Sequence, residues 1–548
     1  YSGAKRVNVA GQSFFISWGK HIHDLGFSLY LKDFILERYS GSMSPKSYES
    51  LVEIRDGDFK QEARIFMNNV LDYKGYRFFQ SSYDQDEKGT ILSVNQDPGK
   101  LTTYIGYTLL FLGMFLNLLN PKSRFRQLAS LVSKDSLKNS APLILICILF
   151  FSTNVKAQDL PNISKEHSDK LAALVLQKLN GRMSPFDTIS KEILEKLYKD
   201  TSYKGMDSNA VVLSMLMNSK AWSEEDIIIM PRNKAVREEI AKILSIEPAD
   251  YISFADFFDE KGQYKLAKYA ENSNRKAPNA RGVFDKEIIK LDERANIVNL
   301  AFLGELFRFL PKQNDSNNAW LTSYEVLTKL SGEEKEVAVV LLDNYFTSVK
   351  NALQSGDWND ANKALDNISA YQKKFSAQIM PSEGKIYGEI FMNESKPFVK
   401  LTPIYLLAGL LLLILIIAKM LKPKLNISLI FKIVYAINVI AFILHSAGLA
   451  MRAYIAEHAP WSNAYESMVY IAWALALSGI FFSRKSPIAL ALTSILSGIV
   501  LQVAHLSEMD PQITNLMPVL DSYWLVIHVS VITASYGFLG LCALLGIF

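Results

Sequence analysis

Long apolar runs in the C-terminal quarter constrain this chain more than any other feature. The clearest is PIYLLAGLLLLILIIAKML at 403–421, and four more follow it: 428–450, 467–482, 487–505 and the run that begins at Trp524. Each approaches the roughly 20 apolar residues that a helix needs to cross a bilayer. The runs therefore predict a bundle of transmembrane helices.

Two further apolar runs lie earlier in the chain. The run at 104–120 is long enough to span if the helix tilts, whereas APLILICILFF and its continuation, at 141–157, are shorter. Basic residues before this second run and the small-residue stretch VKAQ after it have the layout of a signal peptide. Its internal position favours a short span. The alternative is the signal sequence of a second gene product, fused or cleaved.

Composition excludes several classes of protein. The net charge of the 548-residue chain is only +4, so no nucleic-acid-binding footprint is indicated. The two cysteines, Cys147 and Cys542, lie far apart in apolar runs and give no disulfide or zinc pattern. A Cys-Xaa-Xaa-Cys-His motif is absent, so the chain is not itself a c-type cytochrome. Because it begins at Tyr1 and stops at Phe548 within an apolar run, we expect a longer protein.

The charges between the runs predict how the chain threads the membrane. Basic residues cluster in three places: Lys122 to Lys138, Lys422 with Lys424, and Arg484 with Lys485, whereas 506–523 holds no Lys or Arg. The positive-inside rule makes the basic segments cytoplasmic. The outer side then receives 1–103, 158–400, 451–466 and 506–523. This alternation requires 141–157 to be a span.

The sequence predicts a polytopic α-helical membrane protein with two outer domains of different type. Short alternating runs in 1–103 indicate a β-rich domain, and 3.6-residue periodicity in 158–400 indicates an α-helical one. Two spans with a basic cytoplasmic loop occupy 104–157, and the membrane bundle occupies 401–548. Within the helical domain we expect no catalytic residue and three helical segments: 164–181 opened by a Ser164 cap, 285–310, and a hairpin at 341–375.

Several polar residues lie at the edges of the predicted spans. His528 is about one turn inside the last run, and ionisable residues at membrane depth indicate function unless they hydrogen-bond a neighbouring helix. The stretch 452–473 gathers Arg452, His458, Trp461 and Tyr465 near one membrane surface. Interfacial aromatic residues are commonly anchors, and Arg452 is placed to pair with Glu466. For His445, inside a span, a packed and hydrogen-bonded role is favoured over a ligand role.

Several stretches resemble a known family. HAPWSNAYESMVYIAW at 458–473 resembles the P-x-S-N-x-Y-E-S signature of CcsA/ResC proteins, and LMPVLDSYWLVIHVSVITASYGFL at 516–539 resembles their P-x-L-x-S-x-W-L-x-I-H-V stretch. KDFILERYSGSMSPKSYES at 32–50 and MNNVLDYKGYRFFQSSYD at 67–84 resemble the partner family ResB/CcsB. LSVNQDPGKLTTYIGYTLLFLGMF at 92–115 follows the same pattern. Together they resemble the fused cytochrome c synthase of System II cytochrome c biogenesis.

The resemblance implies a haem lyase of the bacterial inner membrane, with its large domains in the periplasm. Such a protein moves haem b to the outer face and attaches it to Cys-Xaa-Xaa-Cys-His of apocytochrome c. It would also meet a thiol-reducing partner protein and membrane lipid. The alternative is a non-enzymatic haem carrier or assembly scaffold for cytochrome maturation.

The resemblance also implies residue roles. The histidine of the W-L-x-I-H-V stretch carries over to His528, which would be an axial ligand of the haem iron. We expect Trp524, Trp461, Tyr465 and Arg452 around the haem. Weaker candidates for ligands are His458 and His445. The family's tryptophan-rich motif and second outer histidine follow this span, so we expect them beyond Phe548.

Overall fold

The computed structural model describes residues 5–9, 12–16, 23–120, 163–484, 486–506 and 509–547. The chain divides into two compact units. The first comprises 1–37, 45–115 and 517–522, and the second comprises 38–44, 116–516 and 523–548. The predicted span at 141–157 lies outside the described residues.

The first unit is rich in β-structure, as predicted for 1–103. Its strands form a hairpin and two three-stranded sheets: β1 (Lys5–Val9) with β2 (Gln12–Ile16); β3 (Ser28–Arg38), β4 (Pro45–Asp56) and β5 (Phe59–Phe66); β6 (Leu71–Tyr73), β7 (Tyr76–Tyr83) and β8 (Thr90–Gln96). Alternate residues of β4 are buried, and Val52 packs with Ile65 and Phe78 in the core. The period-two pattern of the sequence therefore reflects one buried sheet face.

The apolar run at 104–120 forms α1 (Lys100–Leu119). Its large apolar residues, among them Leu110 and Phe111, are exposed to the surroundings. A helix that carries such side chains outward suits a lipid environment. The predicted helix is confirmed, and the membrane crossing of α1 stays a prediction.

The region 163–396 is a helical domain with one large core. Its helices are α3 (Lys165–Ala172), α4 (Phe186–Tyr198), α5 (Ser208–Met217), α6 (Ser219–Ser223), α7 (Lys234–Leu244), α8 (Ala267–Arg275), α9 (Val283–Phe302), α10 (Ser323–Lys329), α11 (Gly332–Ser355), α12 (Asn359–Phe375) and α13 (Glu383–Ser395). Short strand pairs join them: β9 (Val175–Gln177) with β10 (Met183–Pro185), β11 (Ser202–Tyr203) with β12 (Met206–Asp207), β13 (Ile228–Ile229) with β14 (Tyr251–Ile252), and β15 (Leu310–Pro311) with β16 (Trp320–Leu321). The predicted hairpin is confirmed as α11 and α12, separated by Gly356 at φ 78°.

The helix predicted for 164–181 is wrong beyond residue 172. Ser164 does cap α3, since its hydroxyl accepts a hydrogen bond from the His167 amide at 3.2 Å. The helix nevertheless ends at Ala172, because the next residues form β9, whose three side chains are buried against the core. Gly181 then turns the chain at φ 85°, where a Cβ would meet the Ser40 carbonyl oxygen at 2.4 Å. The predicted helix 285–310 likewise ends early, at Phe302.

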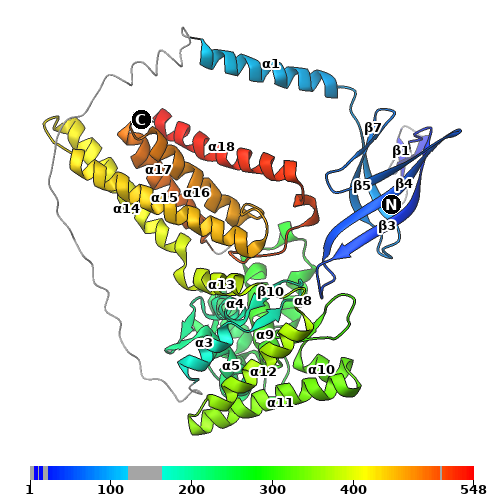
Figure 1. The fold of residues 1–548 in the computed structure, drawn as a ribbon, viewed down its shortest axis with the longest axis vertical. Coiled ribbons are helices and arrows are strands. Elements are labelled where there is room, and N and C mark those ends of the chain that lie inside the picture. The colour runs from blue at the N-terminus through cyan, green and yellow to red at the C-terminus, as the bar shows by residue number, and fades with distance from the viewer. Residues whose placement is uncertain are drawn as a thin grey trace. The chain divides into compact units, whose positions relative to one another are not determined.

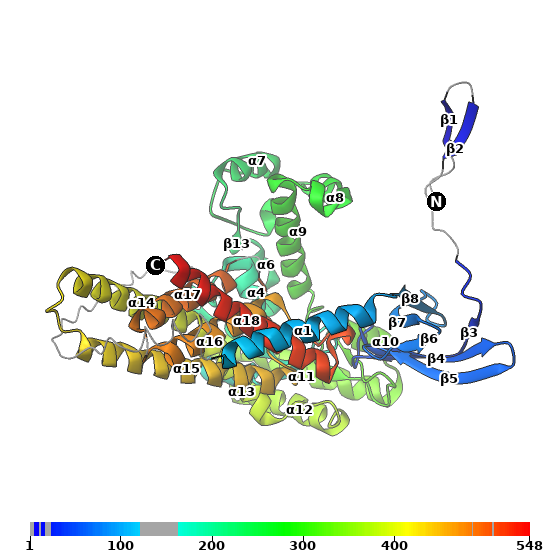
Figure 2. The ribbon, with the colours of Figure 1, turned by 90° about the horizontal axis from the view of Figure 1, so that it is seen from above.

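The C-terminal region is a bundle of five helices: α14 (Pro397–Leu421), α15 (Ser428–Ala456), α16 (Ala464–Phe482), α17 (Pro487–Ala504) and α18 (Tyr523–Ile547). Within the described part of the chain, these five are long and apolar enough to cross a membrane. Figures 1 and 2 both show α14 to α17 side by side, and α18 packs on α16. The fold class predicted from the sequence is confirmed. The bundle begins at Pro397 rather than 401, because Lys396 at φ 43° breaks the chain between α13 and α14.

Consecutive bundle helices run in opposite directions. The first residues of α14, α16 and α18 and the last residues of α15 and α17 therefore share one end, which we call the domain end because α13 of the helical domain leads into it (Figure 1). Lys422, Lys424 and Arg484 occupy turns at the opposite end. The predicted separation of basic turns from the helical domain agrees with this arrangement.

Candidate functional site

The motif Ser-Asn-Ala-Tyr-Glu at 462–466 builds the start of α16. The Asn463 side chain caps the helix by accepting from the Glu466 amide at 2.8 Å. The Glu466 carboxylate accepts in turn from the Ser462 amide at 2.8 Å. Both contacts satisfy amides that a helix start leaves unbonded. Part of this motif is thus a local structural device that aims the Glu466 carboxylate into the bundle.

Arg452 of α15 meets that carboxylate in a buried ion pair. Its Nε donates to Glu466 Oε1 at 2.8 Å, and the two residues keep only 4% and 1% of their surface exposed. The other guanidinium nitrogens donate to the carbonyl oxygens of Pro511 at 2.8 Å and Gln512 at 3.0 Å. The pairing with Glu466 that the sequence indicated is present. A role for Arg452 beside a haem propionate stays a prediction.

Residues 509–516, which we call the strap, connect this cluster to its surroundings. The His458 Nε2 atom lies 3.0 Å from the Thr514 carbonyl oxygen, and its Nδ1 lies 3.1 Å from both the Ala459 carbonyl oxygen and the Ser462 hydroxyl. The Asn515 side chain donates to the Asn180 carbonyl oxygen at 2.7 Å. The strap is therefore bonded to the bundle and to the helical domain, and both ring nitrogens of His458 have partners within the chain.

His445 lies deep in the bundle. Its ring is fully buried, and Nε2 is 3.1 Å from the Val469 carbonyl oxygen. The rings of Phe398 and Tyr405 pack on it at centroid distances of 5.5 and 6.0 Å. Among the described residues, Nδ1 has no hydrogen-bond partner. His445 is thus packed and hydrogen-bonded, and its weaker candidacy as a ligand stays a prediction.

Four aromatic rings form a ladder along α15 and α16. The centroid distances are 4.7 Å from Trp461 to Tyr470, 5.4 Å from Tyr470 to Trp473, and 5.4 Å from Trp473 to Phe442. The Trp473 indole donates to the Ser446 hydroxyl at 2.8 Å. Tyr470, Trp473 and Phe442 are stacked, whereas Trp461 is tilted by 40° to Tyr470. Tyr465 is not part of the ladder, because its ring packs under Arg452 and beside His505.

His528 and Trp524 lie on the outward face of α18. The inward face is a stripe of buried residues, Thr533, Gly537 and Leu541, of which Gly537 packs closely on Ala474 and Leu475 of α16. At about 100° per residue, His528 points about 140° away from Thr533. Trp524 is 76% exposed, and no described residue hydrogen-bonds His528. The structure thus brings Arg452, His458 and Tyr465 together but places no described contact between them and His528.

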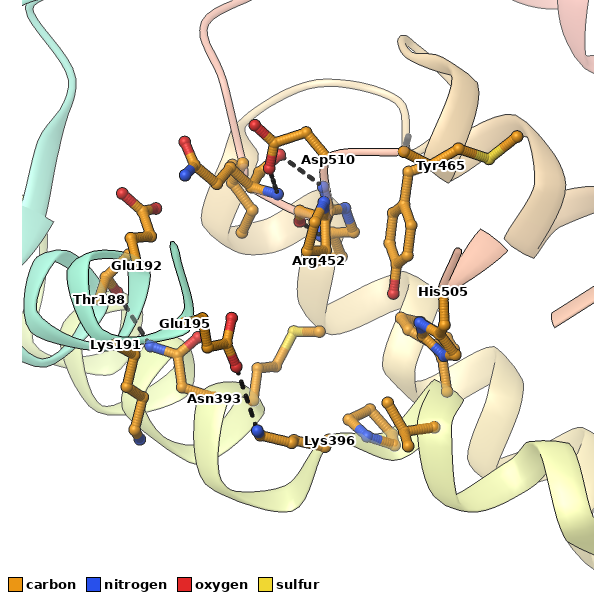
Figure 3. A pocket seen from close by; sticks show the side chains of 18 of the residues that line it. Thr188, Lys191, Glu192, Glu195, Asn393, Lys396, Arg452, Tyr465, His505 and Asp510 are labelled. Atoms are coloured by element: carbon orange, nitrogen blue, oxygen red, sulfur yellow. Dashed lines mark hydrogen bonds and ion pairs between the residues drawn. The ribbon is translucent and has the colours of Figure 1, made fainter. Parts of the chain in front are cut away.

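A pocket of about 580 Å³ opens at the domain end (Figure 3). Helix α4, the α13–α14 junction, the ends of α15 to α17 and the strap all contribute to its wall. Lys396 pairs with Glu195 across it at 3.1 Å. Burial raises the pKa of Glu192, although Lys178 at 2.6 Å opposes the shift. Local sequence does not predict this pocket, because its wall combines segments that are distant in the chain.

The described residues hold no cluster of three or more His, Cys, Asp or Glu side chains fit for a metal ion. Haem iron needs fewer protein ligands than a free metal ion, because the haem ring already binds it. One or two imidazoles and a flat apolar enclosure suffice. A single exposed histidine such as His528 can meet the first requirement.

The fold and these residues define a polytopic membrane protein with a β-rich unit, a helical domain, and a polar and aromatic site at one end of its bundle. Residues 2–91 match the ResB-like family, and residues 461–548 match the family described as cytochrome C assembly protein. Both segments stand in one chain. The chain belongs to the fused ResB/CcsA cytochrome c biogenesis proteins.

Relatives support this assignment along the chain. Protein NrfI of Wolinella succinogenes is 42% identical over 546 residues, which cover 97% of this chain and 59% of that protein. The cytochrome c biogenesis protein CcsA of a Synechococcus strain is 37% identical over 109 residues, 19% of this chain and 34% of that protein. A CcsA of Prochlorococcus marinus is 34% identical over 119 residues, which cover 21% and 38%. The chain spans less than two thirds of the length of each of these relatives.

Proposed function

We propose that this chain is part of a cytochrome c haem lyase that brings haem to the outer face of the membrane and attaches it to apocytochrome c. The observation that carries the proposal is the presence of a ResB-like and a cytochrome c assembly segment in one chain. The family handles haem for cytochrome c assembly, so haem b is the substrate.

His528 is the proposed axial ligand of the haem iron. Its place on the outward face of α18, without a hydrogen bond from any described residue, leaves an imidazole free to bind iron in its neutral form. Trp524 is one turn away on the same face and would wall the haem edge. The exposure of both rings supports the role, since a ligand site must be open from one side.

The remaining predicted haem neighbours divide into two groups. Trp461 belongs to the aromatic ladder, whose rings would provide apolar contacts to the haem. Arg452 and Tyr465 belong to the buried cluster, and Arg452 would have to exchange a present partner to meet a propionate. His458 and His445 stay weaker candidates for ligands. The second axial ligand is proposed to come from beyond Phe548.

The attachment step is an addition. Each thiol of Cys-Xaa-Xaa-Cys-His adds across one haem vinyl group, so a carbon–sulfur bond forms and the thiol proton ends on the neighbouring vinyl carbon. The addition causes no net oxidation or reduction of the thiol and the vinyl group together. Both cysteines must nevertheless be in the reduced thiol form before it. This requirement is the reason for proposing a thiol-reducing partner protein. The iron ligand would hold the haem while the vinyl groups face the peptide.

Replacement of His528 tests the proposal. In the complete protein, His528→Ala should lower the bound haem seen in the absorption spectrum and stop cytochrome maturation. Added imidazole should partly restore both by filling the vacant coordination position. His23→Ala is a matched control on the β-rich unit and should change neither. Full haem content with normal maturation in His528→Ala would contradict the ligand role. Haem binding without any maturation in the wild type would favour a carrier or scaffold.

The proposed location is the bacterial inner membrane, with the helical domain in the periplasm. The basic turns at the far end of the bundle support this orientation. Tags inserted at positions 130 and 350 should differ in protease access in intact spheroplasts, with only the second one cleaved. Equal access at the two positions would overturn the topology.

A further inference from the structure

The pocket at the domain end joins two kinds of wall. On one side, α4 and the end of α13 contribute charged residues, among them Lys191, Glu195 and Lys396. On the other side, the start of α14 and the segment after α17 contribute apolar residues, among them Phe398 and Met509. Because α14 and α17 are long and apolar enough to cross a membrane, a bilayer crossed by them would have its surface near the pocket at their domain end. Such a wall suits a molecule with a polar head and an apolar body.

Tyr465 offers an unused polar group to this pocket. Only 5% of the residue is exposed, and no described residue hydrogen-bonds its hydroxyl. Figure 3 shows the ring pointing that hydroxyl into the open space, with Lys396 on the opposite side. The hydroxyl is accessible from the pocket, so a polar group of a ligand there can form a hydrogen bond with it, as water can.

The charges of the wall indicate the class of ligand. The lining contains five basic side chains and five acidic ones: Lys191, Lys196, Lys199, Lys396 and Arg452 against Glu192, Glu195, Asp200, Glu389 and Asp510. Three of the basic and two of the acidic ones pair with residues outside the lining, so two basic and three acidic side chains remain for a ligand, without an excess of positive charge. Lys396 and Glu195, which pair across the pocket, are both more than one-third exposed and can exchange partners. An excess of positive charge would favour a simple anion. A balanced wall instead favours a zwitterion.

We propose that this pocket binds the headgroup of a zwitterionic phospholipid that carries a primary ammonium, such as phosphatidylethanolamine. Lys396 and the Tyr465 hydroxyl bind the phosphate oxygens, and Glu195 accepts from the ammonium. Phe398 and its apolar neighbours contact the first part of the acyl chains. The bound lipid would join the helical domain to the bundle at the membrane surface. The proposal does not depend on the haem lyase function.

Lipid retention tests the proposal. The complete protein is placed in nanodiscs of phosphatidylcholine with a minor fraction of phosphatidylethanolamine, re-extracted in detergent, and examined by native mass spectrometry. The wild type should retain one phosphatidylethanolamine. Lys396→Gln should retain it about tenfold more weakly, as expected for the loss of a charge-assisted hydrogen bond. Tyr465→Phe should also weaken retention, and Tyr454→Phe, a tyrosine at the same membrane edge outside the pocket, should not.

Several outcomes would overturn the proposal. One is equal retention by wild type, Lys396→Gln and Tyr465→Phe. Another is preferential retention of phosphatidylglycerol in parallel nanodiscs, or of inorganic phosphate added without lipid, since either would indicate a simple anion site. If Tyr465→Phe alone fails to fold, the retention measured for Lys396→Gln decides whether the proposal stands. The Lys396 side chain is 38% exposed and outside the bundle core, so its replacement should not disturb folding.

Discussion

Two groups of polar residues lie at the domain end of the bundle. They differ in how many hydrogen-bond partners their side chains find within the chain. In the first, Arg452 is buried and each kind of guanidinium nitrogen donates to an oxygen of the chain. In the second, His528 and Trp524 stand exposed on the outward face of α18. Ionisable residues at membrane depth are costly in both cases. The difference indicates that the first group stabilises the fold, whereas the second has no hydrogen-bond partner among the described residues and agrees with the ligand role proposed for His528.

The largest loss of stability should follow from breaking the buried ion pair. Glu466→Leu leaves the Arg452 guanidinium buried without its carboxylate, which costs about 3–5 kcal/mol. Unfolding by SDS in mixed micelles, followed by tryptophan emission, measures this change. Glu457→Gln serves as the control, because Glu457 is 70% exposed in its pair with Lys385 and should cost at most about 1 kcal/mol. If Glu466→Leu lowers the free energy of unfolding by less than about 1 kcal/mol, the ion pair does not have the structural role assigned to it.

A smaller loss should follow from removing the helix cap beside it. Asn463→Ala takes away the acceptor of the Glu466 amide and should cost about 1 kcal/mol, as N-cap replacements do. The same unfolding assay measures it. Asn463→Ser and Asn463→Asp keep a capping oxygen and should recover most of the loss. Equal losses in all three variants would mean that Asn463 contributes something other than the cap.

The smallest change in stability should come from the second group. His528→Ala removes an exposed side chain without a partner among the described residues and should cost less than about 0.5 kcal/mol. The same variant should show the loss of haem stated above. A large loss of stability together with a loss of haem would instead place His528 with the structural group. The comparison between the two groups would then fail.

Local patterns predicted much of the fold. The apolar runs gave all five described bundle helices, and the hairpin at 341–375 formed as expected. The failure at 164–181 has a physical cause. Of Val175, Leu176 and Gln177 only the β-branched valine favours a strand, and the surrounding pattern is helical, but their pairing with β10 buries all three. Tertiary burial therefore outweighed the local helical preference.

The candidate site was predictable in part. The approach of Arg452 to Glu466 followed from their common position at a membrane edge. The bonds from Arg452 to the strap did not, since their acceptors are backbone carbonyl oxygens, which every sequence provides. The pocket was likewise invisible, because Tyr465 reads in the sequence as one more interfacial aromatic residue.

The sequence by itself determined the number and direction of the described bundle helices, the β-rich character of the N-terminal unit, the helical character of 163–396, and the family. Each of these depends on properties of neighbouring residues: run length, periodicity, turn charge and motif. Only the tertiary structure decided which polar side chains find partners. Arg452 does so through Glu466 and the strap, whereas the Tyr465 hydroxyl and the His528 ring have no hydrogen bond from any described residue. Satisfaction of a buried polar group depends on atoms that folding brings together from distant segments, and local sequence does not specify them.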